Sequence, residues 1–171
     1  RSSKLKQLIR KVNAKEVQLA FCGHFSAGKS SMINYLMGQD VLPSSPVPTS
    51  ANIVKLKKGK DAVKVIFFDG TYAIFEGKHD MKELKKYCKE GDIKEIHISS
   101  EDFPLSEDCA VLDTPGIDST DDAHRISTES MLHLADIVFY VMDYNHVQSE
   151  ENFLFAKKMQ EAGKKLYLLV N

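Results

Sequence analysis

GHFSAGKSS, residues 23–31, is the stretch that decides the fold of this chain. It follows the apolar run VQLAFC and precedes SMINYLMG, so it joins an expected strand to an expected helix. Its two glycines, its lysine and its hydroxyl match the Gly-x-x-x-x-Gly-Lys-Ser spacing of a phosphate-binding loop. A strand before and a helix after are also the context that this motif requires. The sequence therefore predicts a loop that binds a polyphosphate.

The expected chemistry of the loop follows from its residue types. Glycines carry no β-carbon, so successive backbone N–H groups can wrap around a phosphate, and the helix that begins near Lys29 directs the positive end of its dipole there. Lys29 is expected to reach the β- and γ-phosphates and Ser30 to bind Mg²⁺. For His24 and Phe25, we expect contact with nucleotide or with a partner domain, and exposure to solvent is an equal alternative. The residues expected to line the nucleotide are Gly23, His24, Phe25, Ser26, Ala27, Gly28, Lys29, Ser30 and Ser31.

A second motif, Asp113-Thr114-Pro115-Gly116, follows the apolar run 110–112. An aspartate at the end of a buried strand can hold Mg²⁺, and the N–H of Gly116 can reach the γ-phosphate. Many P-loop ATPases lack this glycine, so the spacing favours a GTPase. Thr49, in the proline-rich loop VLPSSPVPTS, lies where GTPases place the threonine that completes the Mg²⁺ shell. The expected metal ligands are Ser30, Thr49 and Asp113.

The rest of the chain alternates between strand-like and helix-like patterns, which predicts an α/β fold. We expect a P-loop NTPase with a mainly parallel sheet, helices on both faces and an antiparallel extension. The extension is a predicted meander of three strands, and the last apolar runs are predicted to be central strands covered on both faces. Strands are expected at 17–22, 51–56, 62–68, 72–75, 93–99, 110–112, 136–143 and 165–171, and helices at 4–12, 29–37, 80–91, 122–134 and 149–162.

Composition limits the function classes. The chain has 171 residues, of which 43% are hydrophobic, enough for one main domain with its own core. A net charge of -1 provides no overall field that attracts nucleic acid or an anionic membrane. Its three cysteines lie far apart without metal-ligand spacing, which favours a reducing, cytoplasmic location. The chain begins without Met and stops after a strand-like run, so we expect it to be a piece of a longer protein.

Three segments carry a family resemblance: FCGHFSAGKSSMINYLMGQDVLP, PTSANIV and AVLDTPGIDST. Together they resemble the GTPase domain of the dynamin superfamily, most of all bacterial dynamin-like proteins and their mitofusin relatives. The resemblance implies an incomplete GTPase domain over residues 16–171, truncated at its C-terminal end. It also implies that residues 1–15 form a helix joining that domain to a helical bundle that this chain does not contain.

The resemblance implies roles for individual residues. Ser26 would stabilise charge between the phosphates and help hold a monovalent cation, K⁺ or Na⁺. Thr49 would position the attacking water, so that the catalytic set becomes Ser26, Lys29, Thr49 and Gly116. Ile117 stands where small GTPases keep a catalytic glutamine, so face-to-face pairing of two GTPase domains would order the catalytic loops. Asn171 would begin the guanine-reading Asn-Lys-x-Asp motif, whose Lys and Asp are not in this chain.

We therefore expect Mg²⁺-dependent hydrolysis of GTP to GDP, driving GTPase-domain dimerisation and membrane fusion, fission or tethering. The expected partners are nucleotide, a second GTPase domain, and membrane lipid bound through regions outside this chain, with no nucleic acid. The full-length protein would then lie at the cytoplasmic face of a membrane. One alternative is a regulatory or ribosome-associated GTPase switch that does not reshape lipid. Another is an ATP-dependent P-loop enzyme.

Overall fold

The computed structural model describes residues 2–24, 27–42, 53–78, 93–115, 129 and 131–171. These residues divide into two compact units, one formed by residues 1–29 with 114–171 and the other by residues 30–113. Helix α2 (Lys29–Met37) begins on the last residue of the N-terminal segment of the first unit.

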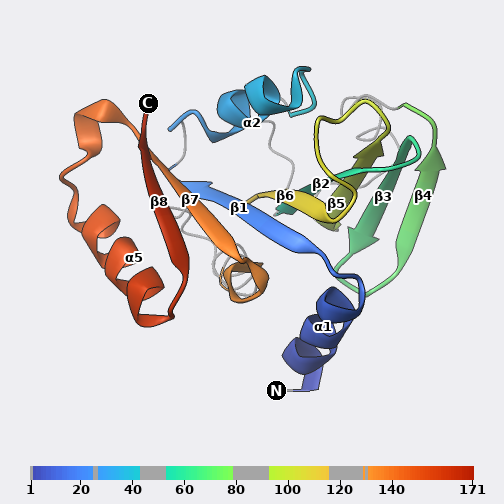
Figure 1. The fold of residues 1–171 in the computed structure, drawn as a ribbon, viewed down its shortest axis with the longest axis horizontal. Helices are drawn as coiled ribbons and strands as arrows, with labels where there is room; N and C mark the ends of the chain where they lie inside the picture. The colour runs from blue at the N-terminus through green and yellow to red at the C-terminus, as the bar shows by residue number, and fades with distance from the viewer. Residues whose placement is uncertain (1, 25–26, 43–52, 79–92, 116–128, 130) are drawn as a thin grey trace. The chain divides into compact units, whose positions relative to one another are not determined.

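The described residues of the first unit form three parallel strands: β1 (Val17–Gly23), β7 (Ile137–Met142) and β8 (Lys165–Val170). They lie in the order β1-β7-β8 (Figure 1). The rings of Phe21, Phe139 and Tyr167 stack across them, with centroids 5.0 and 5.4 Å apart. Because parallel strands end at the same edge of a sheet, the residues that follow β1, β7 and β8 are brought to one edge of this unit.

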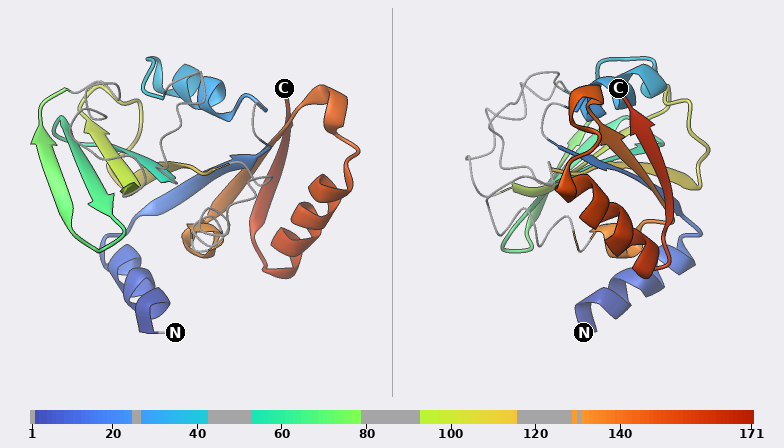
Figure 2. Two further views of the ribbon diagram at one scale, coloured as in Figure 1. Left: turned by 180° about the vertical axis from the view of Figure 1, so that it is seen from behind. Right: turned by 90° about the vertical axis from the view of Figure 1, so that its left-hand side faces the viewer.

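Helix α5 (Glu150–Glu161) starts and stops where the sequence predicts. Ser149 is its N-cap and accepts a hydrogen bond from the N–H of Asn152. Two glutamates in the first turn complement the helix dipole, and Gly163, at φ 68°, follows its end. The helix lies alongside β8 (Figure 2), and the ring of its Phe155 stacks on Tyr140 of β7 at 4.4 Å.

Two apolar surfaces of the first unit are more exposed than the sequence suggests. In α1 (Ser2–Asn13), Leu5, Ile9 and Val12 are 59%, 50% and 71% exposed. β8 was expected to be a central strand, but in the described sheet it is an edge strand, with Leu168 and Val170 each 54% exposed. That expectation was wrong because an apolar run shows that a segment can be buried but does not show which neighbour covers it.

The second unit is mainly antiparallel and also holds α2. Its strands are β2 (Ile53–Lys58), β3 (Ala62–Phe67), β4 (Tyr72–Glu76), β5 (Ile93–Ser100) and β6 (Cys109–Asp113). They lie in the order β4-β3-β5-β2-β6, and only β2 and β5 form a parallel pair. The predicted three-stranded meander is therefore only partly correct. β3 and β4 form a hairpin, but β5 lies between β3 and β2.

The reason for this order lies in burial rather than in chain connectivity. The β3–β4 turn closes locally, because Asp69 accepts hydrogen bonds from the N–H and hydroxyl of Thr71. β5 alternates buried Ile96 and Ile98 with more exposed residues. A position with a strand on each side gives these isoleucines cross-strand partners in both directions, which stabilises the sheet. The predicted helix at 80–91 and most of that at 122–134 lie outside the described residues.

The predicted fold class is confirmed. The structure is an α/β arrangement with parallel strands around the phosphate loop and an antiparallel extension. Predicted helix 29–37 is present as α2 and is followed by Gly38 at φ 69°. In the part of the chain that the structure describes, no helix combines the length and apolar character needed to cross a bilayer.

Candidate phosphate-binding site

The first glycine of the motif lies where β1 meets β7. Gly23 pairs with Val141, and it has φ 148°. A β-carbon built on it would lie 2.1 Å from the carbonyl oxygen of Val141, far inside van der Waals contact. A backbone carbonyl in a parallel ladder cannot move aside without breaking the ladder. The structure therefore requires glycine at this position.

The second glycine meets the end of β8. Gly28 has φ 89°, and a β-carbon on it would lie 2.2 Å from the Asn171 side-chain amide nitrogen. That amide donates to the carbonyl of Ala27 at 3.2 Å, while the backbone N–H of Asn171 donates to Met142 O. Asn171, expected to begin the guanine motif, thus also supports the loop. The Asn171 side chain reaches the loop because β1, β7 and β8 are parallel and end at the same edge.

Lys29 is buried inside the loop and only 8% exposed. Its ammonium donates to the carbonyls of Gly23 and His24, at 3.2 and 2.8 Å. The N–H of Ala27 donates to the same His24 carbonyl at 3.2 Å, which closes the turn. The result is a positive charge held within a curved backbone segment at the start of a helix, the arrangement that favours phosphate binding.

Thr114 has a structural role that the sequence did not reveal, because it attaches the second motif to β1. Its hydroxyl and its N–H both bond to Phe21 O, the hydroxyl donating at 2.9 Å and the N–H at 3.2 Å. The residue is 3% exposed. The start of the second motif is thereby attached to β1, within the first unit. A threonine between an acid and a proline gives no periodic signal, so only the fold identifies this attachment.

In the second unit, the predicted metal ligands Ser30 and Asp113 lie together. The Ser30 hydroxyl donates to an Asp113 carboxylate oxygen at 3.4 Å, although the residues are 83 positions apart. A hydroxyl and a carboxylate are hard oxygen donors that suit Mg²⁺, which keeps several waters and binds substrate phosphates. The described residues contain no group of three or more His, Cys, Asp or Glu placed to hold a metal ion. Two protein oxygen ligands suit a Mg²⁺ ion that draws its other ligands from water and phosphate.

The remaining predicted site residues divide into two sets. Ser31 is exposed on α2 and takes part in none of the contacts above. Four predicted residues and the isoleucine beside the second motif lie outside the described residues: Phe25, Ser26, Thr49, Gly116 and Ile117.

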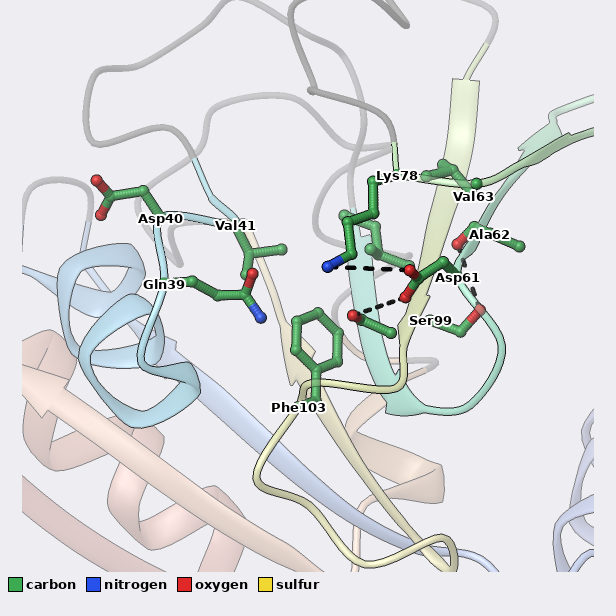
Figure 3. Close-up of a pocket in the computed structure, with 12 residues that line it drawn as sticks. Gln39, Asp40, Val41, Asp61, Ala62, Val63, Lys78, Ser99 and Phe103 are labelled. Carbon is green, nitrogen blue, oxygen red and sulfur yellow. Dashed lines mark hydrogen bonds and ion pairs between the residues drawn. The ribbon is translucent and has the colours of Figure 1, made fainter.

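The second unit also contains a hollow of about 220 Å³ (Figure 3). Asp61, Lys78, Ser99 and Phe103 are among the residues that line it, and neither Ser30 nor Asp113 does so. Its polar groups bond to one another: Asp61 accepts from the Ser100 hydroxyl at 2.9 Å and lies 4.0 Å from the Lys78 ammonium. The hydrogen bond from Ser100 is the main cause that lowers the pKa of Asp61. The lining of this hollow shares no residue with the candidate site.

Comparison with known proteins decides the family. The Dynamin family model matches residues 19–171, nearly the whole chain. The chain belongs to the dynamin family. This family consists of GTPases, and the match covers both the phosphate loop and the Asp113 motif.

Among its dynamin relatives, Dynamin-like protein A of Bacillus subtilis (strain 168) is 44% identical over 172 aligned positions, covering 100% of this chain and 14% of that protein. Dynamin-like protein 1 of Campylobacter jejuni is 26% identical, covering 89% of this chain and 26% of that one. The chain thus spans well under half of the length of these two relatives. The expected resemblance to bacterial dynamin-like proteins is confirmed.

A solved bacterial dynamin has the same fold. It comes from an oligomerised pair described as providing a mechanism for the long-range sensing and tethering of membranes. The match has a TM-score of 0.70 at 22% identity and covers 99% of this chain and 34% of that one. At this identity the likeness establishes the fold alone.

Proposed function

We propose that this dynamin-family chain is a nucleotide-binding GTPase domain that hydrolyses GTP with Mg²⁺. The observation that carries the proposal is the buried Lys29 ammonium, held by the Gly23 and His24 carbonyls within a loop whose two glycines have no room for a side chain. A polyphosphate oxygen would join these carbonyls as a partner of the ammonium, which has three N–H donors. The family supports guanine as the base.

The proposed roles follow from the contacts. Lys29 neutralises charge on the β- and γ-phosphates, and the loop N–H groups bind their oxygens. Ser30 and Asp113, already 3.4 Å apart, supply oxygen atoms to the metal. When bound, Mg²⁺ would offset the negative charge that develops as the γ-phosphate leaves. We keep the predicted roles of three further residues. Ser26 stabilises charge between the phosphates and helps hold a monovalent cation, Thr49 positions the attacking water, and Gly116 senses the γ-phosphate.

We further propose that two GTPase domains pair when nucleotide is bound. Ile117 cannot orient a water molecule by hydrogen bonding, because its side chain has no polar atom. A second copy would order the loops around Thr49 and Gly116, and these loops would then orient the attacking water in place of residue 117. In the full-length protein, cycles of pairing and release would act on a membrane, as the solved bacterial dynamin pair is described as sensing and tethering membranes.

Calorimetric titration of the full-length protein with GTP and with ATP, each with Mg²⁺, tests the nucleotide. Binding of GTP at least tenfold tighter than ATP is expected. Equal affinities would favour the ATP-dependent P-loop enzyme. Thr49→Ala should retain GTP affinity and lose hydrolysis, and normal turnover by this variant would show that the assignment of its loop is wrong.

Pairing is tested by the dependence of turnover on protein concentration. If two domains complete each other's site, GTP hydrolysis per molecule rises with concentration and then reaches a plateau. A specific activity that stays constant from nanomolar to micromolar protein would contradict activation by pairing. Light scattering with the nonhydrolysable GTP analogue GMPPNP and with GDP then reports whether the dimer depends on the bound nucleotide.

A further inference from the structure

A buried asparagine links helix α5 to the phosphate loop. Asn152 is the third residue of α5 and is only 4% exposed. Its side-chain nitrogen donates to the carbonyls of His146 and Val147, at 2.7 and 3.2 Å. Its side-chain oxygen accepts from the hydroxyl of Tyr140, at 2.7 Å, and lies 3.0 Å from Nε2 of His24. One amide therefore serves four partners from three parts of the first unit.

These partners fix the orientation of the amide. Carbonyl oxygens only accept hydrogen bonds, so the Asn152 atom that faces His146 and Val147 must be the nitrogen. The opposite orientation would place the amide oxygen against two carbonyl oxygens, with no hydrogen atom between them to form a bond. The Asn152 atom that faces His24 is therefore an oxygen.

The orientation of the amide fixes the tautomer of His24. Because the Asn152 oxygen can only accept, Nε2 of His24 must carry the hydrogen. In the neutral ring, Nδ1 is then an acceptor and cannot donate to a phosphate oxygen. The main chain of the same residue accepts from Lys29 Nζ and from the N–H of Ala27. The ring of His24 thus contacts α5, and the carbonyl of the same residue contacts Lys29 and the loop. His24 therefore connects α5 to the phosphate loop.

We infer that Asn152 is a positioning residue of the phosphate loop, which holds His24, and with it the carbonyl that orients Lys29, in the geometry that binds nucleotide. The inference rests on the proposed function, because its consequence is a change in GTP affinity. Asn152 need not touch the nucleotide to have this effect.

A purely structural role for Asn152 predicts something different. If the amide served only to hold the turn at 146–147 and the start of α5, its loss would lower stability, and the chemistry of residue 24 would have no influence on GTP binding. The positioning role requires that binding depend on a donor at the place of the His24 Nε2 atom. A matched pair of substitutions at residue 24 separates the two.

Glutamine and asparagine imitate different nitrogens of the imidazole. The amide nitrogen of glutamine reaches the place of Nε2, whereas that of asparagine reaches only the place of Nδ1. His24→Gln should therefore keep GTP affinity within about threefold of the wild type. His24→Asn should lose about tenfold, or about 1.4 kcal/mol. The affinities are measured by titration of the full-length protein with GTP and Mg²⁺, beside melting temperatures.

Asn152→Ala should weaken GTP binding about as much as His24→Asn, and the double variant should be no weaker than either, because both remove the same contact. Tyr140→Phe is the control: it removes the other bond to the same oxygen, and it should lower the melting temperature without changing affinity. Equal affinities for His24→Gln and His24→Asn, or additive losses in the double variant, would overturn the inference alone. A wild-type protein that fails to bind GTP would overturn the proposed function and this inference with it.

Discussion

The two units hold their polar residues in different ways. In the first, Gly23 ends β1, and His24 and Asn171 follow the ends of parallel strands. Backbone carbonyls in the loop accept hydrogen bonds there from the side chains of Lys29 and Asn171. In the second, many charged side chains bond to one another near solvent, as in Lys60 with Glu76, whose side chains are 77% and 79% exposed. Backbone contacts at a parallel edge leave little freedom for substitution, whereas exposed ion pairs contribute little. We expect sensitivity to mutation to follow this division.

The largest expected effect is the loss of Lys29. Lys29→Ala removes a charge that would make several charge-assisted bonds to phosphate, each worth about 1.5–3 kcal/mol, so GTP affinity should fall by about 100-fold or more. Calorimetric titration measures this loss. Lys158→Ala on α5, which removes only an exposed ion pair with Glu129, is the control and should bind as the wild type does. Equal binding by both variants would remove the distinction between loop and surface.

Gly23→Ala should unfold or severely destabilise the first unit. The added methyl would collide with Val141 O at 2.1 Å, and a backbone with φ 148° is strained for alanine. We expect a loss of about 3 kcal/mol in the free energy of unfolding. Chemical denaturation measures it. Gly59→Ala in the second unit is a suitable control, because its nearest neighbour would be a side-chain atom of Ser99 at 3.8 Å. A smaller loss for Gly23→Ala than for the control would contradict the comparison.

Removal of the α5 cap should have a moderate effect. Ser149→Ala leaves the N–H of Asn152 without its capping oxygen and should cost about 1 kcal/mol in thermal or chemical unfolding. The counterpart in the second unit is Ser106→Ala, which removes a hydrogen bond to Asp108 in an exposed turn. Its cost should stay below about 0.5 kcal/mol. The reverse order would show that exposed turns in the second unit matter more than their exposure suggests.

The smallest effect concerns the pH dependence of the second unit. The hydrogen bond from His97, at 3.0 Å, is the main cause that lowers the pKa of Glu95. A carboxyl whose pKa is lower in the folded state stabilises the fold above its unfolded pKa of about 4.3, and this contribution disappears as pH falls through the lowered folded value. Glu95→Gln should therefore cost about 1 kcal/mol at pH 7 and less at pH 3.

Denaturation of both proteins at the two pH values measures the difference. Glu107→Gln, a change at an exposed glutamate, is the matched control and should show no such trend. If the cost of Glu95→Gln were the same at pH 3 and pH 7, ionisation of Glu95 would not be the source of its stabilising effect.

Local patterns predicted much of the fold because they depend on neighbouring residues. The glycine and lysine spacing around 23–30 placed the strand–loop–helix unit, and Ser149 with Gly163 marked both ends of α5. The placement of β5 between β3 and β2 did not follow, because strand order depends on pairing between distant segments. The contact between Asn152 and His24 did not follow from the sequence either, because the two residues are 128 positions apart and no motif surrounds the asparagine.

The sequence by itself determined the chemical type of the site: a glycine loop with a lysine and a hydroxyl, followed by an aspartate at a strand end. Those residues are specified by what a phosphate and a metal ion require. Only the tertiary structure decided what supports them, namely Val141 against Gly23, Asn171 against Gly28, and Asn152 against His24. The physical reason is that parallel strands far apart in the chain must pair before the residues beyond their ends can meet.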